Sequence, residues 1–130
     1  MTVQKLMNLE GRRALITGAT GGLGSVMADT LAELGADLIL VDLPGADFST
    51  LKKLLEDNWG IKVWSYHCDL EQNSQRQELV DYVKNDHDIL DILINNAAFV
   101  GTSNLSGWST NFESQTVETW QRALEVNLTA

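Results

Sequence analysis

The sequence has few residues that could cross-link or stiffen the chain, and no apolar run long enough to cross a membrane. Among 130 residues it has one cysteine, Cys68, and one proline, Pro44. A single thiol cannot form an intrachain disulfide or build a cysteine-rich metal site. Its longest aliphatic runs, such as residues 38–41, are far shorter than the roughly 20 residues that cross a bilayer. We therefore expect side-chain packing to stabilise the fold.

Basic side chains are also scarce. Nine Lys and Arg stand against 18 Asp and Glu, which gives a formal net charge of −9 at pH 7. A field of this sign repels nucleic-acid phosphates and anionic membranes. The first ten residues show no apolar segment or cleavage site of a secretory signal. We therefore expect a cytoplasmic protein that binds neither nucleic acid nor membrane, and no metal, because His67 and His87 have no ligand partners at metal spacing.

Apolar runs of two kinds alternate along the chain. Short runs at 13–17, 38–42, 61–66 and 89–95 are typical of strands, and helical stripes lie between them. This alternation predicts an α/β fold with a doubly wound, Rossmann-like parallel sheet in one domain over residues 1–130. Residues 99–115 show no period and predict a loop.

Two helical stripes predict buried faces. Gly35 follows the first stripe as a C-terminal cap, and the last stripe runs to the end of the chain without a stop signal. The first consists of Leu23, Val26, Met27, Leu31 and Leu34, and the last of Val117, Trp120, Leu124 and Leu128.

A glycine-rich turn, TGATGGLG at 17–24, joins the first strand to the first helix. Glycines let a backbone approach a bulky anion, and the helix N-terminus offers free N–H groups to a pyrophosphate. A tight structural turn has the same composition, so the turn alone leaves both interpretations open. The candidate phosphate site consists of Thr17, Gly18, Thr20, Gly21, Gly22, Leu23 and Gly24.

Asp42 ends the second strand, 24 positions after Gly18. A carboxylate roughly 20 residues after such a turn accepts hydrogen bonds from an adenosine ribose, although Asp42 could equally cap the turn before Pro44. It would repel a 2′-phosphate about 4 Å away by roughly 4 kcal/mol. Neither 17–24 nor 43–45 contains Lys or Arg. The sequence therefore favours NAD over NADP.

Two other classes also use glycine loops. A P-loop starting at Gly18 needs Gly and Lys where the chain has Leu23 and Gly24, so that class is excluded. A Rossmann-type methyltransferase is not excluded by the first 45 residues, but the motifs that follow them exclude it.

The order of several short motifs resembles a known family. The turn matches Thr-Gly-x-x-x-Gly-x-Gly, and Asp42, Asp69-Leu70, Asn95-Asn96-Ala97 and Val126-Asn127-Leu128 follow it. This set is similar to the N-terminal half of the short-chain dehydrogenase/reductase family. The chain would then be the N-terminal portion of an NAD(P)-binding Rossmann domain, truncated after about four strands, without the catalytic C-terminal part.

The resemblance implies a role for each motif. Asp42 would hold the adenosine ribose, Asp69 and the Leu70 amide the adenine, and Asn95 would brace the central strands. Asn96 and Ala97 would line the cofactor, and Asn127 would hold a water of the catalytic proton relay. Ala98 stands where the family usually has Gly, which predicts either a costly positive φ or a different turn.

The resemblance also implies an activity: hydride transfer between NAD and an alcohol or carbonyl substrate. Residues 95–108 resemble members that modify flagellin or surface sugars, which favours a sugar derivative. In the family, the helix with Asn127 helps to form homo-oligomers, and Trp120, Leu124 and Leu128 could do so here, although they also fit packing on the sheet.

The chain lacks part of the family's chemistry. The proton donor is a Tyr followed four positions later by a Lys, but Leu70 follows Tyr66 and Asp86 follows Tyr82. We expect the 130 residues alone to be inactive, as part of a longer enzyme. The alternative is a non-catalytic module that binds NAD or a protein partner. The sequence does not identify the substrate, the direction of turnover or the oligomer, nor whether the chain is naturally this long.

Overall fold

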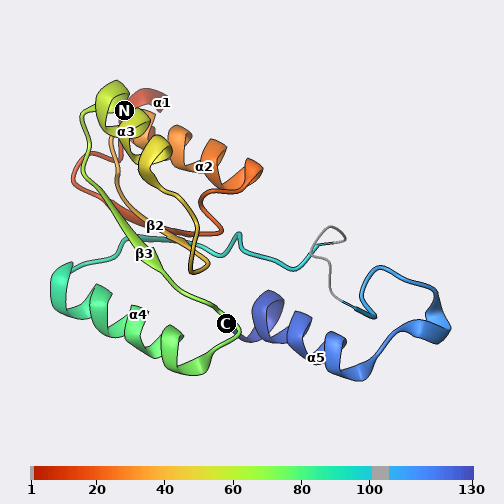
Figure 1. Ribbon diagram of the computed structural model, residues 1–130. Coiled ribbons are helices and arrows are strands. Elements are labelled where there is room, and N and C mark those ends of the chain that lie inside the picture. The colour runs from red at the N-terminus through yellow and green to blue at the C-terminus, as the bar shows by residue number, and fades with distance from the viewer. Residues whose placement is uncertain (1, 101–105) are drawn as a thin grey trace.

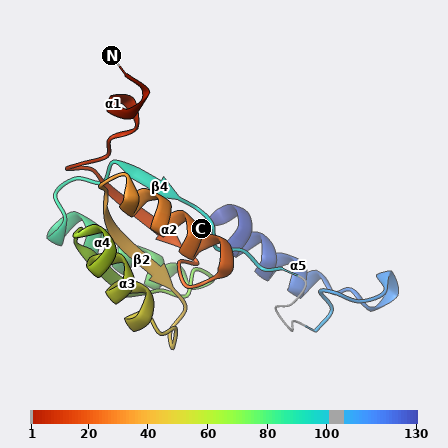
Figure 2. The same ribbon diagram turned by 90° about the horizontal axis from the view of Figure 1, so that it is seen from above.

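The computed structural model describes residues 2–100 and 106–130. They form a four-stranded sheet with helices on both faces (Figure 1, Figure 2). The elements follow in the order α1 Val3–Met7, β1 Arg13–Thr17, α2 Gly22–Glu33, β2 Asp37–Asp42, α3 Ser49–Trp59, β3 Val63–His67, α4 Asn73–Asp86, β4 Ile92–Ile94, η1 Phe112–Ser114, α5 Val117–Leu124 and η2 Glu125–Thr129.

The sheet is parallel throughout, with the strand order β3-β2-β1-β4. Leu15 of β1 pairs with Ile39 of β2 and with Leu93 of β4, so β1 lies inside the sheet. Both β1 and β2 are almost wholly buried, as expected for parallel strands covered on two faces. The predicted doubly wound α/β fold is confirmed.

Alternate side chains of β1 and β2 supply two hydrophobic cores. Ile16 and Leu40 pack in the core under α2 and α3. Leu15 and Ile39 point to the opposite face, where Leu79 of α4 covers them. In Figure 1, α2 and α3 accordingly lie above the sheet and α4 below it. α5 extends sideways from this body, past the carboxyl end of the sheet.

The predicted buried face of the first helix is wrong in part. The Leu23 side chain is 72% exposed and that of Val26 63%. The residues of α2 that are buried are Gly24, Ala28 and Ala32, spaced by four. Because the backbone of α2 lies close to the end of β1, this face takes only small residues, and the larger side chains lie beside it or point outward. The predicted cap at Gly35 is confirmed, with a φ of +95°.

The last helical stripe also points outward. α5 buries Thr119 and Ala123, whereas Trp120, Leu124 and Leu128 are 49%, 45% and 78% exposed. Of the two interpretations of this stripe, packing on the sheet is therefore not seen among the described residues. The predicted loop at 99–115 contains the short η1, and its residues 101–105 lie outside the described part of the chain.

The described residues contain neither a membrane-spanning helix nor a group of metal ligands. None of their helices has the length and apolar character needed to cross a membrane. Within 2–100 and 106–130, no three His, Cys, Asp or Glu side chains are grouped as a metal site requires.

Candidate functional site

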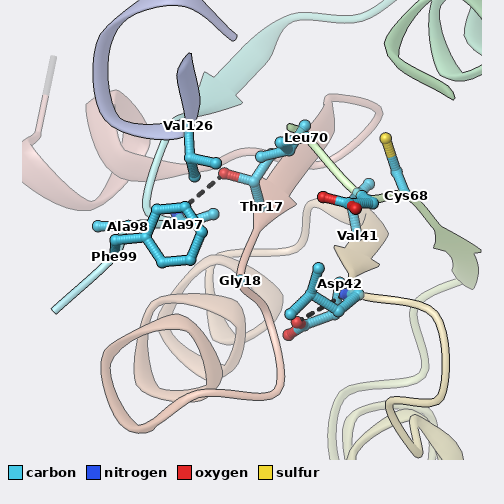
Figure 3. Close-up of a pocket in the computed structure, with 12 residues that line it drawn as sticks. Thr17, Gly18, Val41, Asp42, Cys68, Leu70, Ala97, Ala98, Phe99 and Val126 are labelled. Carbon is cyan, nitrogen blue, oxygen red and sulfur yellow. Dashed lines mark hydrogen bonds between the residues drawn. The ribbon is translucent and has the colours of Figure 1, made fainter. Parts of the chain in front are cut away.

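A pocket of about 290 Å³ lies at the carboxyl ends of the parallel strands (Figure 3). Parallel strands end at one edge of a sheet, and their loops bring distant residues together there. Among the predicted site residues, those that line this pocket are Thr17, Gly18, Asp42, Asp69, Leu70 and Ala97. The other predicted site residues are not among those that line it: Thr20, Gly21, Gly22, Leu23, Gly24, Asn96 and Asn127.

The glycine turn is held by close backbone contacts. Gly18 has a φ of +64°, and its carbonyl accepts a hydrogen bond from the Gly21 N–H at 3.2 Å. A Cβ on Gly24 would lie only 2.2 Å from the Gly18 carbonyl oxygen. Beside Gly22, in contrast, a Cβ would meet nothing within 4 Å. The turn therefore needs glycine at 18 and 24 for its own shape, while Gly22 leaves open space at the start of α2.

The first turn of α2 has no side-chain cap. Gly21 is the N-cap residue and makes no side-chain hydrogen bond. The hydroxyl of Ser25 donates to the carbonyl of Gly22 at 3.2 Å. Because the first N–H groups of a helix have no partner inside it, those of α2 remain available to an anion.

Asp42 joins the end of β2 to the glycine turn. Its Oδ2 accepts hydrogen bonds from the Thr20 N–H at 2.8 Å and from the Thr20 hydroxyl at 2.7 Å. Its Oδ1 accepts from the Leu43 N–H at 2.9 Å. Asp42 therefore caps its own turn and also lines the pocket, so the two predicted roles are compatible. An ionised carboxylate accepts about four hydrogen bonds, which leaves room for a ligand hydroxyl.

Asn96, rather than Asn95, braces the central strands. Its Nδ2 donates to the carbonyls of Thr17 at 2.9 Å and Gly18 at 3.1 Å. The Thr17 hydroxyl oxygen accepts from the N–H groups of Asn96 and Ala97 at 3.1 and 3.0 Å. Asn95 is exposed. The chain turns directly after β4, where the Asn96 N–H also contacts the Ile94 carbonyl, and this turn directs Asn96 toward β1.

The backbone at Ala98 avoids the predicted strain. Asp88 alone among the described non-glycine residues has a positive φ. Ala98 therefore takes an ordinary conformation, and the backbone here does not require glycine.

The loop before α4 forms another wall of the pocket. The Asp69 N–H donates to Oε1 of Gln75 at 2.7 Å, and Asp69 Oδ1 accepts from the Glu71 N–H at 3.0 Å. These bonds fix Asp69 in a turn and leave its other oxygen without a partner in the described chain. Cys68 is buried beside it, and burial raises the pKa of its thiol. Cys68 is thus an unreactive lining residue.

Asn127 lies on η2, the π-helical turn that follows α5. Its Oδ1 accepts from the Phe99 N–H at 2.8 Å, and its Nδ2 donates to the Phe99 carbonyl at 3.4 Å. Both bonds tie the end of the helix to the chain that leaves β4. Asn127 itself does not line the pocket, whereas its neighbour Val126 does.

The sequence interpretation missed several residues around this pocket. Phe99 and Val126 line it. Val126 belongs to a motif quoted above and Phe99 lies two residues after another, so their positions in the sequence could have indicated them. Two arginines, Arg76 and Arg122, link its walls through ion pairs with Glu125 and Glu71. Partners 49 and 51 positions apart leave no periodic signal in a sequence.

Comparisons with known proteins agree with this geometry. The family model "short chain dehydrogenase" matches residues 12–130. The NADP-dependent mannitol dehydrogenase of Alternaria alternata is 29% identical over 98% of this chain and 46% of its own. A short-chain type dehydrogenase/reductase from Mycobacterium marinum superimposes with a TM-score of 0.84 at 28% identity, over 99% of this chain and 49% of its own. An NAD+-bound xylitol dehydrogenase superimposes with a TM-score of 0.78 at 27% identity, over 93% of this chain and 44% of its own.

The chain belongs to the short-chain dehydrogenase family of oxidoreductases, as the motifs indicated. It spans about half the length of the curated relatives that it matches.

Proposed function

We propose that the pocket binds NAD and that the chain is the cofactor-binding part of an enzyme that transfers hydride between NAD and an alcohol or carbonyl. The observation that carries this proposal is the corner formed by Asp42 and Thr20. A strand-end carboxylate there adjoins both the pocket and the uncapped N-terminus of α2. A dinucleotide needs these two features together, one for a ribose and one for a pyrophosphate.

The phosphate end of the cofactor fits the turn. The open space beside Gly22 and the free N–H groups of α2 would receive the pyrophosphate. Thr17, Gly18, Gly21, Leu23 and Gly24 would shape this cradle through the backbone. At the far wall, the unpaired Asp69 oxygen and the Leu70 N–H would bind the adenine, and Ala97 with the Asn96 brace would support the nicotinamide side.

The preference for NAD over NADP rests on charge. Among the described residues, those that line the pocket include Asp42 and Asp69 and contain no Lys or Arg. A 2′-phosphate near Asp42 would meet a like charge without a cation to offset it. The relatives divide on this point, since the mannitol dehydrogenase is NADP-dependent and the xylitol dehydrogenase structure holds NAD+.

The bound nicotinamide would accept or supply the hydride, and this chain would position it. Asn127 would hold a water for proton transfer beside the pocket, while the Tyr and Lys of the family would come from sequence outside these residues. A sugar derivative is the proposed substrate class. The likeness of 95–108 to sugar-modifying members supports this choice, as do relatives named for mannitol and xylitol.

Calorimetric titration of the full chain with NAD and with NADP tests the proposal. We expect NAD to bind at least about tenfold more tightly, because a tenfold ratio needs only about 1.4 kcal/mol of the repulsion at Asp42. Equal affinities would remove Asp42 from the ribose site. Binding of neither cofactor would overturn the proposal as a whole.

A non-catalytic NAD-binding module is the second candidate, and the two tyrosines favour it. Tyr66 and Tyr82 stack on each other with ring centroids 4.7 Å apart, and burial raises the pKa of both phenols. Neither phenol suits proton transfer at neutral pH. The two candidates are separated by measuring NADH formation from NAD and polyols with two proteins. One is the 130-residue chain, and the other is this chain joined to sequence that carries the Tyr and Lys of the family. Absence of activity in both proteins favours the module.

A further inference from the structure

Two crossed ion pairs connect α5 to the wall of the pocket near α4. Arg122 on α5 binds Glu71 through a fork, with Nε–Oε1 at 2.5 Å and Nη2–Oε2 at 2.9 Å. In the opposite sense, Nη2 of Arg76 on α4 binds Oε1 of Glu125 at 2.6 Å. We call these four side chains the arginine clamp. Each side of the contact thus supplies one acid and one base.

The clamp is partly sheltered from solvent. Its side chains are 17% exposed at Arg76, 35% at Glu125, 20% at Glu71 and 49% at Arg122, whereas those of the Lys53–Asp57 pair on α3 are 77% and 60% exposed. Ion pairs away from bulk water are less screened by salt, and forked guanidinium–carboxylate pairs fix geometry as well as charge. The clamp is therefore suited to holding one relative position of two segments.

The segments it joins both line the pocket. Arg76 also donates a short hydrogen bond to the Leu70 carbonyl, and Glu71 directly follows Leu70. On the other side Glu125 precedes Val126, and the Arg122 guanidinium lies 5.9 Å from the centre of the Phe99 ring. Leu70, Phe99 and Val126 all line the pocket (Figure 3).

Apolar packing gives α5 little support in the described chain. It buries only Thr119 and Ala123, and its large apolar side chains are at least 45% exposed, with Trp120 in ring contact with Trp108. Near the pocket, a pair of hydrogen bonds joins Asn127 to Phe99. Polar contacts therefore dominate the placement of this helix.

We propose that Arg76 and Arg122 are positioning residues, which hold α5 against residues 69–71 and so set this side of the pocket. The identity of the pocket's occupant rests on the proposed function, but the placement of α5 does not. Where NAD binds, the clamp couples the wall at Asp69–Leu70 to the helix that carries Asn127, so that occupancy of one end steadies the other.

Hydrogen exchange of the full chain without ligand tests the clamp itself. We expect Glu71→Gln and Arg122→Gln each to speed exchange of the amides of 117–129 by about tenfold, because a charged hydrogen bond that limits local opening is lost. The charge-swapped double variant, Glu71→Arg with Arg122→Glu, should restore most of the protection, which a merely disruptive substitution would not. Lys53→Gln, which breaks an exposed pair on α3, is the matched control and should change nothing at 117–129.

Unchanged exchange in both single variants, or a swap that restores nothing, overturns the proposal. This result does not depend on any ligand. If the exchange measurements show that the clamp protects 117–129 but the wild-type chain binds no NAD, the proposed function fails and the positioning role of the arginines stands.

Nucleotide titration tests the coupling. We expect Arg122→Gln to weaken binding of both NAD and AMP by about three- to tenfold, since both would use the Asp69–Leu70 wall, while Lys53→Gln binds like wild type. A variant with a loosened α5 that binds both nucleotides as wild type does would refute the link between clamp and pocket.

Discussion

Two sides of the pocket are built in opposite ways. At the glycine turn, β1 and β2 end side by side, and backbone contacts with the Asp42–Thr20 hydrogen bonds fix the geometry. At α5, a helix with little buried surface is held by two ion pairs and by Asn127. The first side is a rigid part of the sheet edge, whereas the second is an attached element. We therefore expect changes at the turn to alter stability and affinity strongly, and changes at α5 to act mainly on placement.

Substitution within the glycine turn should give the largest effect. In Gly24→Ala the new methyl would overlap the Gly18 carbonyl, which forces α2 away from β1. We expect a loss of about 2–3 kcal/mol in the free energy of unfolding, measured by urea denaturation. Gly22→Ala is the matched control, because its methyl meets open space. It should leave stability unchanged or higher and weaken NAD, since the methyl occupies the proposed phosphate cradle. Equal stability of the two variants would contradict the close approach at Gly24.

Charge reversal at the ribose corner ranks second. Asp42→Arg removes the acceptor for the ribose hydroxyls and supplies a cation for a 2′-phosphate. We expect NAD affinity to fall by about ten- to a hundredfold and NADP affinity to rise, as measured by calorimetric titration. Asp42→Asn, which removes the charge but keeps the shape, should give an intermediate ratio. An unchanged ratio in both variants would assign Asp42 to the turn alone.

The sequence predicted the backbone of the first side of the pocket, for a physical reason. A strand, a glycine turn and a helix are consecutive in the chain, so Gly18 and Gly24 carry a local pattern, and Asp42 ends the next apolar run. The buried face of α2 was predicted wrongly, because side-chain periodicity does not show that the helix approaches the sheet too closely for Leu23 and Val26 to lie beneath it.

The second side could not be predicted in the same way. Arg122 and Glu71 are distant in the chain and look like ordinary surface charges. Assigning the brace to Asn95 rather than Asn96 was a one-residue error, since the direction of a side chain after a strand depends on the turn that follows. Contacts between non-adjacent elements need the fold before they can be seen.

A hydroxyl deletion at Thr20 should have a smaller effect. Thr20→Val keeps the N–H bond to Asp42 and loses the hydroxyl bond. We expect about 1 kcal/mol lower stability and a few-fold weaker NAD binding, measured by urea denaturation and titration. Thr20→Ser, which retains the hydroxyl, should behave like wild type. A Ser variant as weak as the Val variant would point to the lost methyl group rather than the hydrogen bond.

The smallest effect is expected from protonation of His87, which lies away from both sides of the pocket and lowers the stability of the fold in acid. His87 is buried against Trp64 and Tyr82, with Arg13 and Asp86 as its charged neighbours, and its ring nitrogens have no hydrogen-bond partner among the described residues. Burial, and then Arg13, lower the pKa of His87. The fold therefore favours the neutral ring, and its contribution is complete above the ordinary value near 6.5 and declines as the pH falls below it.

Urea denaturation between about pH 8 and about pH 5 measures this contribution. His87→Phe, which keeps an aromatic ring without a proton site, should flatten part of the acid-side slope. The wild-type chain over the same pH range is the comparison. A slope that is the same in the wild type and in His87→Phe would assign the acid sensitivity to other groups.

The strand order carries one more consequence. After β3 the chain passes beyond β2 and β1 to add β4 on the far side, so the strand order reverses its direction of growth between β1 and β4. A crevice at such a reversal of winding is a property of the connectivity, not of the side chains around it. Exchange of lining residues during evolution would therefore change which molecule is selected, while the site stays where the path of the backbone has put it.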